Sequence, residues 1–118
     1  MNERDGLFLI HVLGAIADIE SFAAEGRLVF LADRKTQSAV IRQLEIVGEA
    51  VKNLSLELVA AEGGVPWRQI AGTRDRLIHA YFSVDLEAVW AMVEQDLPAL
   101  RENVQRILGS APSDPGKT

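Results

Sequence analysis

The stretch DLEAVWAMVEQDLPALRENVQRIL, residues 85–108, carries an apolar stripe that decides the fold class. Large apolar side chains recur in it at alternating spacings of four and three, at Leu86, Trp90, Val93, Leu97, Leu100, Val104 and Ile107. This spacing predicts an α-helix with one buried face. We expect Ser83 or Asp85 to cap it. Because Pro98 cannot donate to the carbonyl of Glu94, we also expect a kink just before the proline or two shorter helices.

Further helices are predicted on both sides of a glycine. A first stripe precedes Gly26 and indicates a helix capped by Asn2 or Asp5; it consists of Phe8, Val12, Ala15, Ile19 and Phe22. Gly26 is expected to end or bend that region. Beyond it, a stripe of Ile41, Leu44, Gly48, Val51 and Leu58 predicts a long second helix, with a neighbouring line of Val40, Val47 and Leu54. Its wide apolar face favours a place in the centre of a bundle or in a subunit interface.

No sustained alternation typical of strands occurs. The sequence therefore predicts an all-α fold, an up-and-down bundle of four to five helices. Residues 1–108 would form this single domain, and residues 109–118, rich in Ser, Pro and Gly, a disordered tail.

Composition limits the function classes. The chain has 118 residues, no cysteine and a net charge of -5, which excludes a disulfide framework and argues against coating nucleic acid through bulk positive charge. Any polyanion must be held by a local site, and residues 27–82 are mildly basic, with eight bases and six acids. The apolar run at residues 7–17 is too short to span a bilayer and lacks a cleavage site. We expect a cytoplasmic protein without a membrane partner.

The eight residues RDRLIHAY, from Arg74 to Tyr81, gather groups suited to chemistry. They include two guanidinium groups, on Arg74 and Arg76, a neutral-pH proton carrier, His79, and a phenol. If Thr73 caps a short helix, Arg74 lies in its first turn, where free N–H groups and the helix dipole favour a phosphate.

Two spacings within this cluster bear on its use. Asp75 and His79 are four residues apart, so the carboxylate could orient the imidazole. Arg74 and His79 are five apart, about 140° around a helix, and diverge in one chain. A two-fold dimer would bring both kinds of group from two copies into one groove. A purely structural role, in solvent exposure and packing, also explains such a pattern.

The other histidine, His11, lies in an apolar stretch, and we interpret it as partly buried with a local hydrogen bond. Only two histidines exist, which excludes a metal site built on several imidazoles within one chain. We expect no metal and no cofactor.

The pattern Arg74-x4-His79-x-Tyr81 resembles the R-x4-6-H signature of the HEPN superfamily, in the R-x4-H-x-Y form of the HepT-like toxins. Residues 39–50, AVIRQLEIVGEA, are similar to that family's second helix, and residues 65–72, VPWRQIAG, to the segment before its signature. Residues 85–90 and the Leu97-Pro98 pair are similar to the helix after it. The resemblance covers residues 7–108 and departs at Thr73, where relatives often have methionine.

The resemblance implies a HEPN-like fold and a metal-independent endoribonuclease toxin that acts as a homodimer, with both signatures lining one cleft. Arg74 and His79 would be catalytic, and Asp75 and Arg76 would support or orient them. It also implies a partner, a minimal nucleotidyltransferase antitoxin of the MntA type, which would attach AMP to Tyr81 and silence the toxin.

RNA chemistry is compatible with these roles, because RNA carries its own nucleophile, the 2'-OH. His79 of one copy would accept its proton, the second His79 would protonate the leaving 5'-oxygen, and Arg74 would hold the phosphate. Two alternatives stay open. One is a catalytically silent partner of a nucleotidyltransferase, which presents a nucleotide or the Tyr81 hydroxyl. The other is a helical dimer whose only role is assembly.

Overall fold

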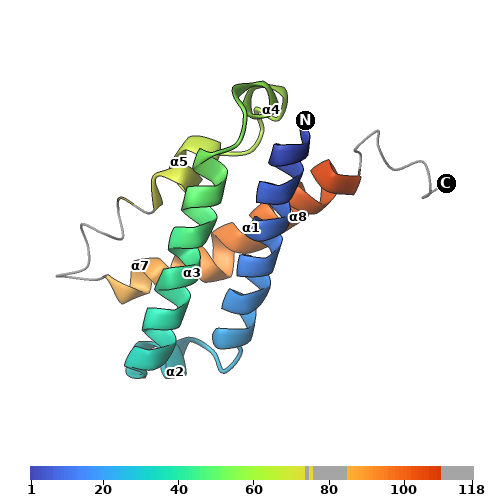
Figure 1. Ribbon diagram of the computed structural model, residues 1–118. Coiled ribbons are helices and arrows are strands. Elements are labelled where there is room, and N and C mark those ends of the chain that lie inside the picture. The colour runs from blue at the N-terminus through green and yellow to red at the C-terminus, as the bar shows by residue number, and fades with distance from the viewer. Residues whose placement is uncertain (74, 76–84, 110–118) are drawn as a thin grey trace.

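A computed structural model describes residues 1–73, 75 and 85–109 of the chain, and this part is helical throughout (Figure 1). The elements are α1 (Glu3–Phe22), α2 (Arg27–Ala32), α3 (Arg34–Lys52), α4 (Leu56–Ala61), α5 (Trp67–Ala71), α7 (Leu86–Ala91), the π-helical segment η1 (Met92–Asp96) and α8 (Leu97–Gly109). The all-α class predicted from the sequence is confirmed for the described residues. The tail expected at residues 110–118 lies outside them.

Helices α1 and α3 run antiparallel side by side and form the centre of the bundle, and α8 packs across α1 (Figure 1). Their contact faces supply most of the fully buried side chains, among them Leu9, Val12, Ile16 and Ile19 of α1, Val40 of α3 and Val104 of α8. Each buried aliphatic side chain contributes about 1.5–3 kcal/mol relative to exposure. The core therefore lies between these three helices.

The first turn of α1 is tied to the start of α4 through Asp5, a carboxylate that is only 1% exposed. Its two oxygens accept hydrogen bonds from the backbone N–H of Ser55 (2.8 Å) and from the Ser55 hydroxyl (2.7 Å). Asn2 and Asp5 also form a reciprocal capping box. Burial alone would raise the pKa of Asp5, but these hydrogen bonds outweigh it, so the pKa lies below its ordinary value.

The second long helix is shorter than the sequence predicts. Leu58 was expected on it, but α3 ends at Lys52 and Leu58 lies on α4. The reason is polar: the side-chain amide of Asn53 turns back to donate to the Glu49 carbonyl (2.8 Å), and Ser55 caps α4 by accepting from Leu58 N–H (3.1 Å).

The chain from α7 through η1 to α8 follows one helical path. The predicted disturbance before Pro98 is present, and it takes the form of a π-helical turn at Met92–Asp96. Pro98 has no N–H for the Glu94 carbonyl, and the N–H of Leu97 reaches back five residues to Met92. The wider π-helical turn thus accommodates the proline within one continuous helical path.

Candidate functional site

The predicted site begins where α5 ends. Asp75 is helical and exposed to solvent. The other members of the predicted cluster, Arg74, Arg76, His79 and Tyr81, lie outside the described residues, so their mutual arrangement stays a prediction. What the structure defines is the framework on either side of them.

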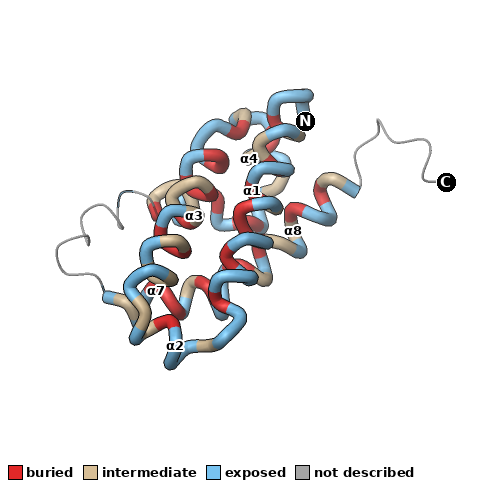
Figure 2. Tube along the Cα trace, turned by 60° about the horizontal axis from the view of Figure 1, so that its bottom comes forward, coloured by how far each residue is buried: buried red, intermediate tan, exposed pale blue. Residues whose placement is uncertain are grey.

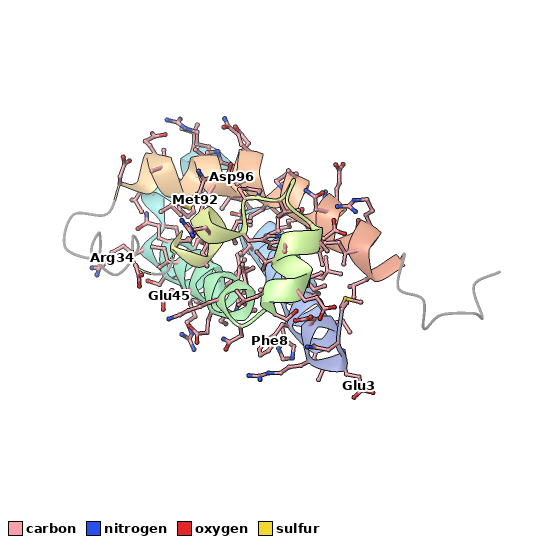
Figure 3. All side chains as sticks on the ribbon, turned by 90° about the horizontal axis from the view of Figure 1, so that it is seen from above. Glu3, Phe8, Arg34, Glu45, Met92 and Asp96 are labelled. Atoms are coloured by element: carbon pink, nitrogen blue, oxygen red, sulfur yellow. The ribbon has the colours of Figure 1, made fainter. Side chains whose placement is uncertain are left out.

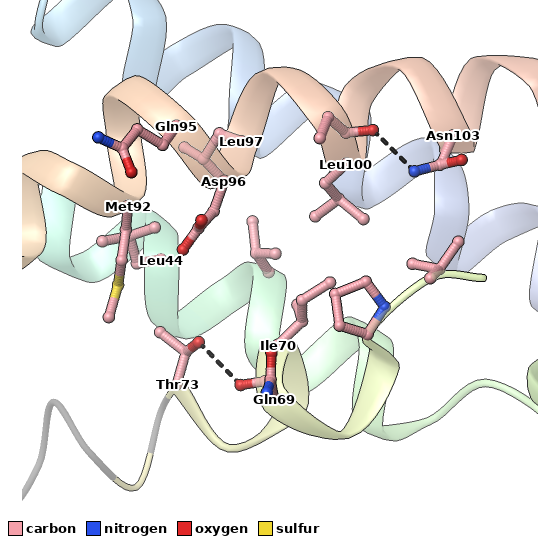
Figure 4. Close-up of a pocket in the computed structure, with 14 residues that line it drawn as sticks. Leu44, Gln69, Ile70, Thr73, Met92, Gln95, Asp96, Leu97, Leu100 and Asn103 are labelled. Carbon is pink, nitrogen blue, oxygen red and sulfur yellow. Dashed lines mark hydrogen bonds between the residues drawn. The ribbon is translucent and has the colours of Figure 1, made fainter. Parts of the chain in front are cut away.

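On the N-terminal side, α5 packs against α3 and carries the chain to Thr73. Trp67 anchors the helix: its ring is buried and its Nε1–H donates to the Glu62 carbonyl (3.1 Å). Thr73 is itself buried, and its hydroxyl donates to the Gln69 carbonyl (3.3 Å; Figure 4). The backbone that enters the Arg74–Tyr81 stretch is therefore held to the core. The cap role predicted for Thr73 concerns residues that follow it and are not described.

On the C-terminal side, Asp85 starts α7, and its carboxylate accepts from Ala88 N–H (3.1 Å). Of the two predicted caps, Ser83 and Asp85, Asp85 is thus confirmed as a cap of α7. The indole of Trp90 lies against the Phe30 ring, with 5.4 Å between ring centroids, and joins α7 to α2. An exposed pair between Arg27 and Glu87 makes a second contact between these helices.

A cavity of about 210 Å³ opens beside Thr73, between α3, α5, η1 and α8 (Figure 4). Its apolar walls are Leu44, Val47, Val65, Pro66, Ile70, Met92, Leu97, Ala99 and Leu100. Its polar lining is Gln69, Thr73, Gln95, Asp96 and Asn103. The cavity lies directly at the entrance to the signature, and one wall is the residue before Arg74.

The cavity is electrostatically different from a phosphate site. Asp96 supplies a carboxylate, and the cavity's described lining holds no basic side chain. Asn103 is fixed in place, since its amide donates to the Ala99 carbonyl (3.0 Å) and accepts from Arg106 (3.2 Å). Apolar walls with a few fixed polar groups are typical of small-molecule subsites. In this cavity the carboxylate of Asp96 offers hydrogen-bond acceptors.

Sequence reasoning missed Asp96 and Asn103 as site residues. A signal was present, because the two are seven residues apart and so share a face of the helix next to its apolar stripe. Whether this face meets α5 depends on how the helices pack, and the spacing of apolar residues along the sequence does not record that packing.

The interpretation of His11 is wrong in one respect, since its side chain is exposed rather than partly buried. It makes an edge-to-face contact with Phe8, with 6.4 Å between ring centroids. Within residues 1–73, 75 and 85–109, no group of three or more His, Cys, Asp or Glu side chains gathers to hold a metal ion. None of the helices in this described part is long and apolar enough to cross a membrane.

Comparison with known proteins agrees with the sequence resemblance. Residues 12–107 match the family model described as ribonuclease HepT-like. A protein of Thermococcus cleftensis named probable ribonuclease HepT is 44% identical over 101 residues, 85% of this chain and 92% of that protein. A protein of Methanocaldococcus jannaschii named as a putative RNase is 40% identical over 102 residues, 86% of this chain and 84% of that protein.

A second Methanocaldococcus jannaschii protein, named as a gamma-glutamylcyclotransferase and putative RNase, is 39% identical over 103 residues, 86% of this chain and 46% of that protein. No solved structure gives a significant match to this chain. The family model spans the core helices, the anchored α5 and the whole Arg74–Tyr81 signature. The chain therefore belongs to the HepT-like ribonuclease family.

Proposed function

We propose that this protein is the toxin of a toxin–antitoxin pair and acts as a metal-independent endoribonuclease. The observation that carries the proposal is the match of residues 12–107 to the ribonuclease HepT-like model, because this span holds Arg74, His79 and Tyr81. The relatives named as ribonucleases cover the same part of the chain.

The reaction we propose is attack by a ribose 2'-OH on the adjacent phosphorus. The bond from O2' to phosphorus forms and the bond from phosphorus to O5' breaks, which leaves a 2',3'-cyclic phosphate and a 5'-hydroxyl end. His79 of one copy takes the 2'-OH proton, and His79 of the second copy gives a proton to O5'. Arg74 neutralises charge on the phosphorane oxygens.

A homodimer is part of the proposal because one chain holds only half of these groups. Arg74 and His79 are five residues apart, so a helical signature would turn them about 140° away from each other, and a two-fold axis beside the signature would bring both kinds of group to one phosphate. The burial of Thr73 on the N-terminal side and the start of α7 at Asp85 on the C-terminal side support a site beside the bundle, because they fix where the chain enters and leaves residues 74–84.

The cavity beside Thr73 supports RNA as the substrate. At about 210 Å³ it is smaller than the roughly 300–1,000 Å³ of drug-sized ligand sites, and a single flat ring would fill much of it. We propose that it receives a nucleobase next to the cleaved phosphate. Asp96 would accept hydrogen bonds from ring or exocyclic N–H groups, which guanine and cytosine offer on their pairing edges.

Control by modification completes the proposal. A minimal nucleotidyltransferase antitoxin would transfer AMP from ATP to the Tyr81 hydroxyl, two residues from His79. The bond from the Tyr81 oxygen to the α-phosphorus forms, the phenol proton is lost, and pyrophosphate leaves. The added nucleotide brings bulk and negative charge to the cleft and so excludes RNA by contact and by repulsion. Mass spectrometry after co-expression with a cognate nucleotidyltransferase should find the added AMP on Tyr81 and none on Tyr81→Phe. Its absence from the wild type would refute this control.

A second candidate is a catalytically silent partner of a nucleotidyltransferase. The net charge of -5 favours it, because a negative protein disfavours close approach of a polyanion. In that case the cavity would present a nucleotide and cut nothing.

One experiment separates the two candidates. The purified protein is incubated with total RNA in EDTA, and new ends are scored for cyclic phosphate. Wild type should cleave, and His79→Ala and Arg74→Ala should not. The matched control is His11→Ala, which removes the chain's other histidine from the exposed side of α1 and should leave cleavage unchanged. If wild type produces no cyclic-phosphate ends, or if His79→Ala still cleaves RNA, the proposed ribonuclease activity is overturned.

A further inference from the structure

Helix α1 is apolar on two opposite sides. Leu9, Val12, Ile16 and Ile19 are fully buried, but Leu7 and Ile10 are 59% and 54% exposed. Leu7, Ile10, Gly14 and Ala17 repeat the 3-4-3 spacing of the buried set. In Figure 2 the tube of α1 accordingly alternates between buried and exposed residues. We name the four exposed residues the outer stripe.

The outer stripe forms a continuous surface. At 100° per residue its members fall within about 80° of the helix circumference, centred about 160° from the buried set. Gly14 and Ala17 are exposed, and a Cβ placed on Gly14 would meet no atom within 4 Å. The described helices thus leave this side of α1 uncovered, with two large side chains followed by two small ones.

We propose that the outer stripe is a contact surface for a second copy of this chain, with the two α1 helices antiparallel. In that orientation Leu7 of one copy faces Ala17 of the other, and Ile10 faces Gly14, twice each. Large side chains then lie against small ones along the whole contact, which permits close approach of the helices. In a parallel pair, large would meet large and small would meet small.

The charges beside the stripe favour the same arrangement. Arg4 and Asp18 lie along one edge of the stripe, fourteen residues and about 21 Å apart. The guanidinium of Arg4 lies over the Phe8 ring, 5.5 Å from its centroid, and would turn away from that ring to reach a second copy. An antiparallel copy brings its Asp18 to this end, so two Arg4–Asp18 pairs form across the two-fold axis. A parallel copy would set Arg4 against Arg4. The surface is therefore complementary to itself.

This contact is separate from the proposed cleft. Viewed down the bundle, Glu3, which lies in line with the stripe at the start of α1, is on the opposite side from Met92 and Asp96 of the cavity wall (Figure 3). The α1 pairing does not rest on the proposed ribonuclease. If both contacts form, each chain has two different two-fold interfaces, and the assembly grows beyond a dimer.

Sedimentation velocity over a concentration series tests the proposal. Ile10→Glu puts a charge on the stripe and Gly14→Leu fills the space that a second helix needs. Both sites are exposed, and Gly14→Leu raises helix propensity, so neither variant should unfold the protein. Each should raise the dissociation constant of the α1 contact at least about tenfold and halve the mass of the largest species. Leu56→Glu is the control, because Leu56 is apolar and 86% exposed on α4.

The sedimentation results either support or overturn the contact between two α1 helices. A wild type that is monomeric at all concentrations, or variants whose mass distribution equals that of wild type, would overturn the proposal. The same holds if Leu56→Glu has the effect of Ile10→Glu. Arg4→Asp and Asp18→Arg should each weaken the contact, and the double variant should restore it. Failure of that rescue would overturn the antiparallel pairing.

Cross-linking reads the orientation directly, because the chain contains no cysteine. A mixture of Ile10→Cys and Gly14→Cys chains should oxidise to a mixed disulfide dimer, since the two positions face each other. A parallel pair would instead give dimers of each variant with itself. A mixture of Ile10→Cys and Leu56→Cys should give no preferred product. Dominant self-linked dimers would overturn the antiparallel arrangement.

Discussion

Removal of the Asp5 carboxylate should destabilise the protein far more than its place in the first turn of a helix suggests. Asp5 holds the backbone and the hydroxyl of Ser55, fifty residues away, and is 1% exposed. Asp5→Ala deletes both bonds and leaves the Ser55 N–H without its acceptor. Hydrogen bonds to charged groups contribute about 1.5–3 kcal/mol each.

Two such bonds give an expected loss of about 3–6 kcal/mol in the free energy of unfolding for Asp5→Ala. In a domain of this size the melting temperature would fall by roughly 10–25 °C. Asp5→Asn keeps the shape and one acceptor oxygen, so it should cost about half as much. Urea denaturation followed by circular dichroism, at one fixed protein concentration, measures both changes. Glu102→Ala, on the exposed side of α8, is the control and should stay within about 0.5 kcal/mol of wild type.

The pH dependence follows from the lowered pKa of Asp5. A carboxylate whose pKa is lower in the folded state stabilises the protein above its unfolded pKa of about 4, and this contribution is lost as the pH falls through the folded value. The stability difference between wild type and Asp5→Asn should therefore shrink as the pH drops below about 4. A loss under about 1 kcal/mol for Asp5→Ala at neutral pH, or a difference that does not change with pH, would refute the role assigned to this carboxylate.

Other substitutions test further features. Gly26 has a φ of 95°, so Gly26→Ala should cost about 1–2 kcal/mol in chemical denaturation; an unchanged midpoint would contradict the strain. Trp67→Phe should lower the free energy of unfolding by about 1 kcal/mol more than Trp90→Phe does. The reason is that Trp67 Nε1–H donates to the Glu62 carbonyl, whereas the buried Nε1–H of Trp90 has no acceptor among the described residues. Equal losses of stability would contradict this difference. If the cavity receives a base, Asp96→Asn should change which nucleotide flanks the cut, as read by sequencing RNA ends. An unchanged preference would remove the cavity from the proposed site.

Periodicity predicted the helices well where one side of a helix is polar, as in α3 and α8. On α1 it correctly predicts the burial of Val12, Ala15 and Ile19, but it also assigns Phe8, which is only half-buried, and Phe22 to the core stripe. The structure instead buries Leu9 and Ile16 and leaves Phe22 41% exposed. A helix that is apolar on opposite sides offers more than one plausible stripe, and only its neighbours select between them.

Local chemistry predicted the caps, because Asn2 and Asp85 act within three residues of their own positions. The burial of Asp5 could not be predicted from local sequence, because its hydrogen-bond partner Ser55 lies fifty residues further along the chain. The signature was found from its spacing alone. The cavity beside it was not, because four elements build it and no local pattern records how they meet.

The π-helical turn at Met92–Asp96 has a consequence for the evolution of chain length. A π turn holds more residues than an α turn, so deletion of a single residue there would let the helix close into regular turns. Because a π turn holds about one residue more than an α turn, the helix before the deletion would keep nearly the same facing relative to α8, and Trp90 would stay against Phe30. A gain or loss of one residue at this point can therefore be absorbed without repacking of α7, and Pro98, which has no N–H for the Glu94 carbonyl, favours the longer form. Homologues without the proline are expected to be one residue shorter here.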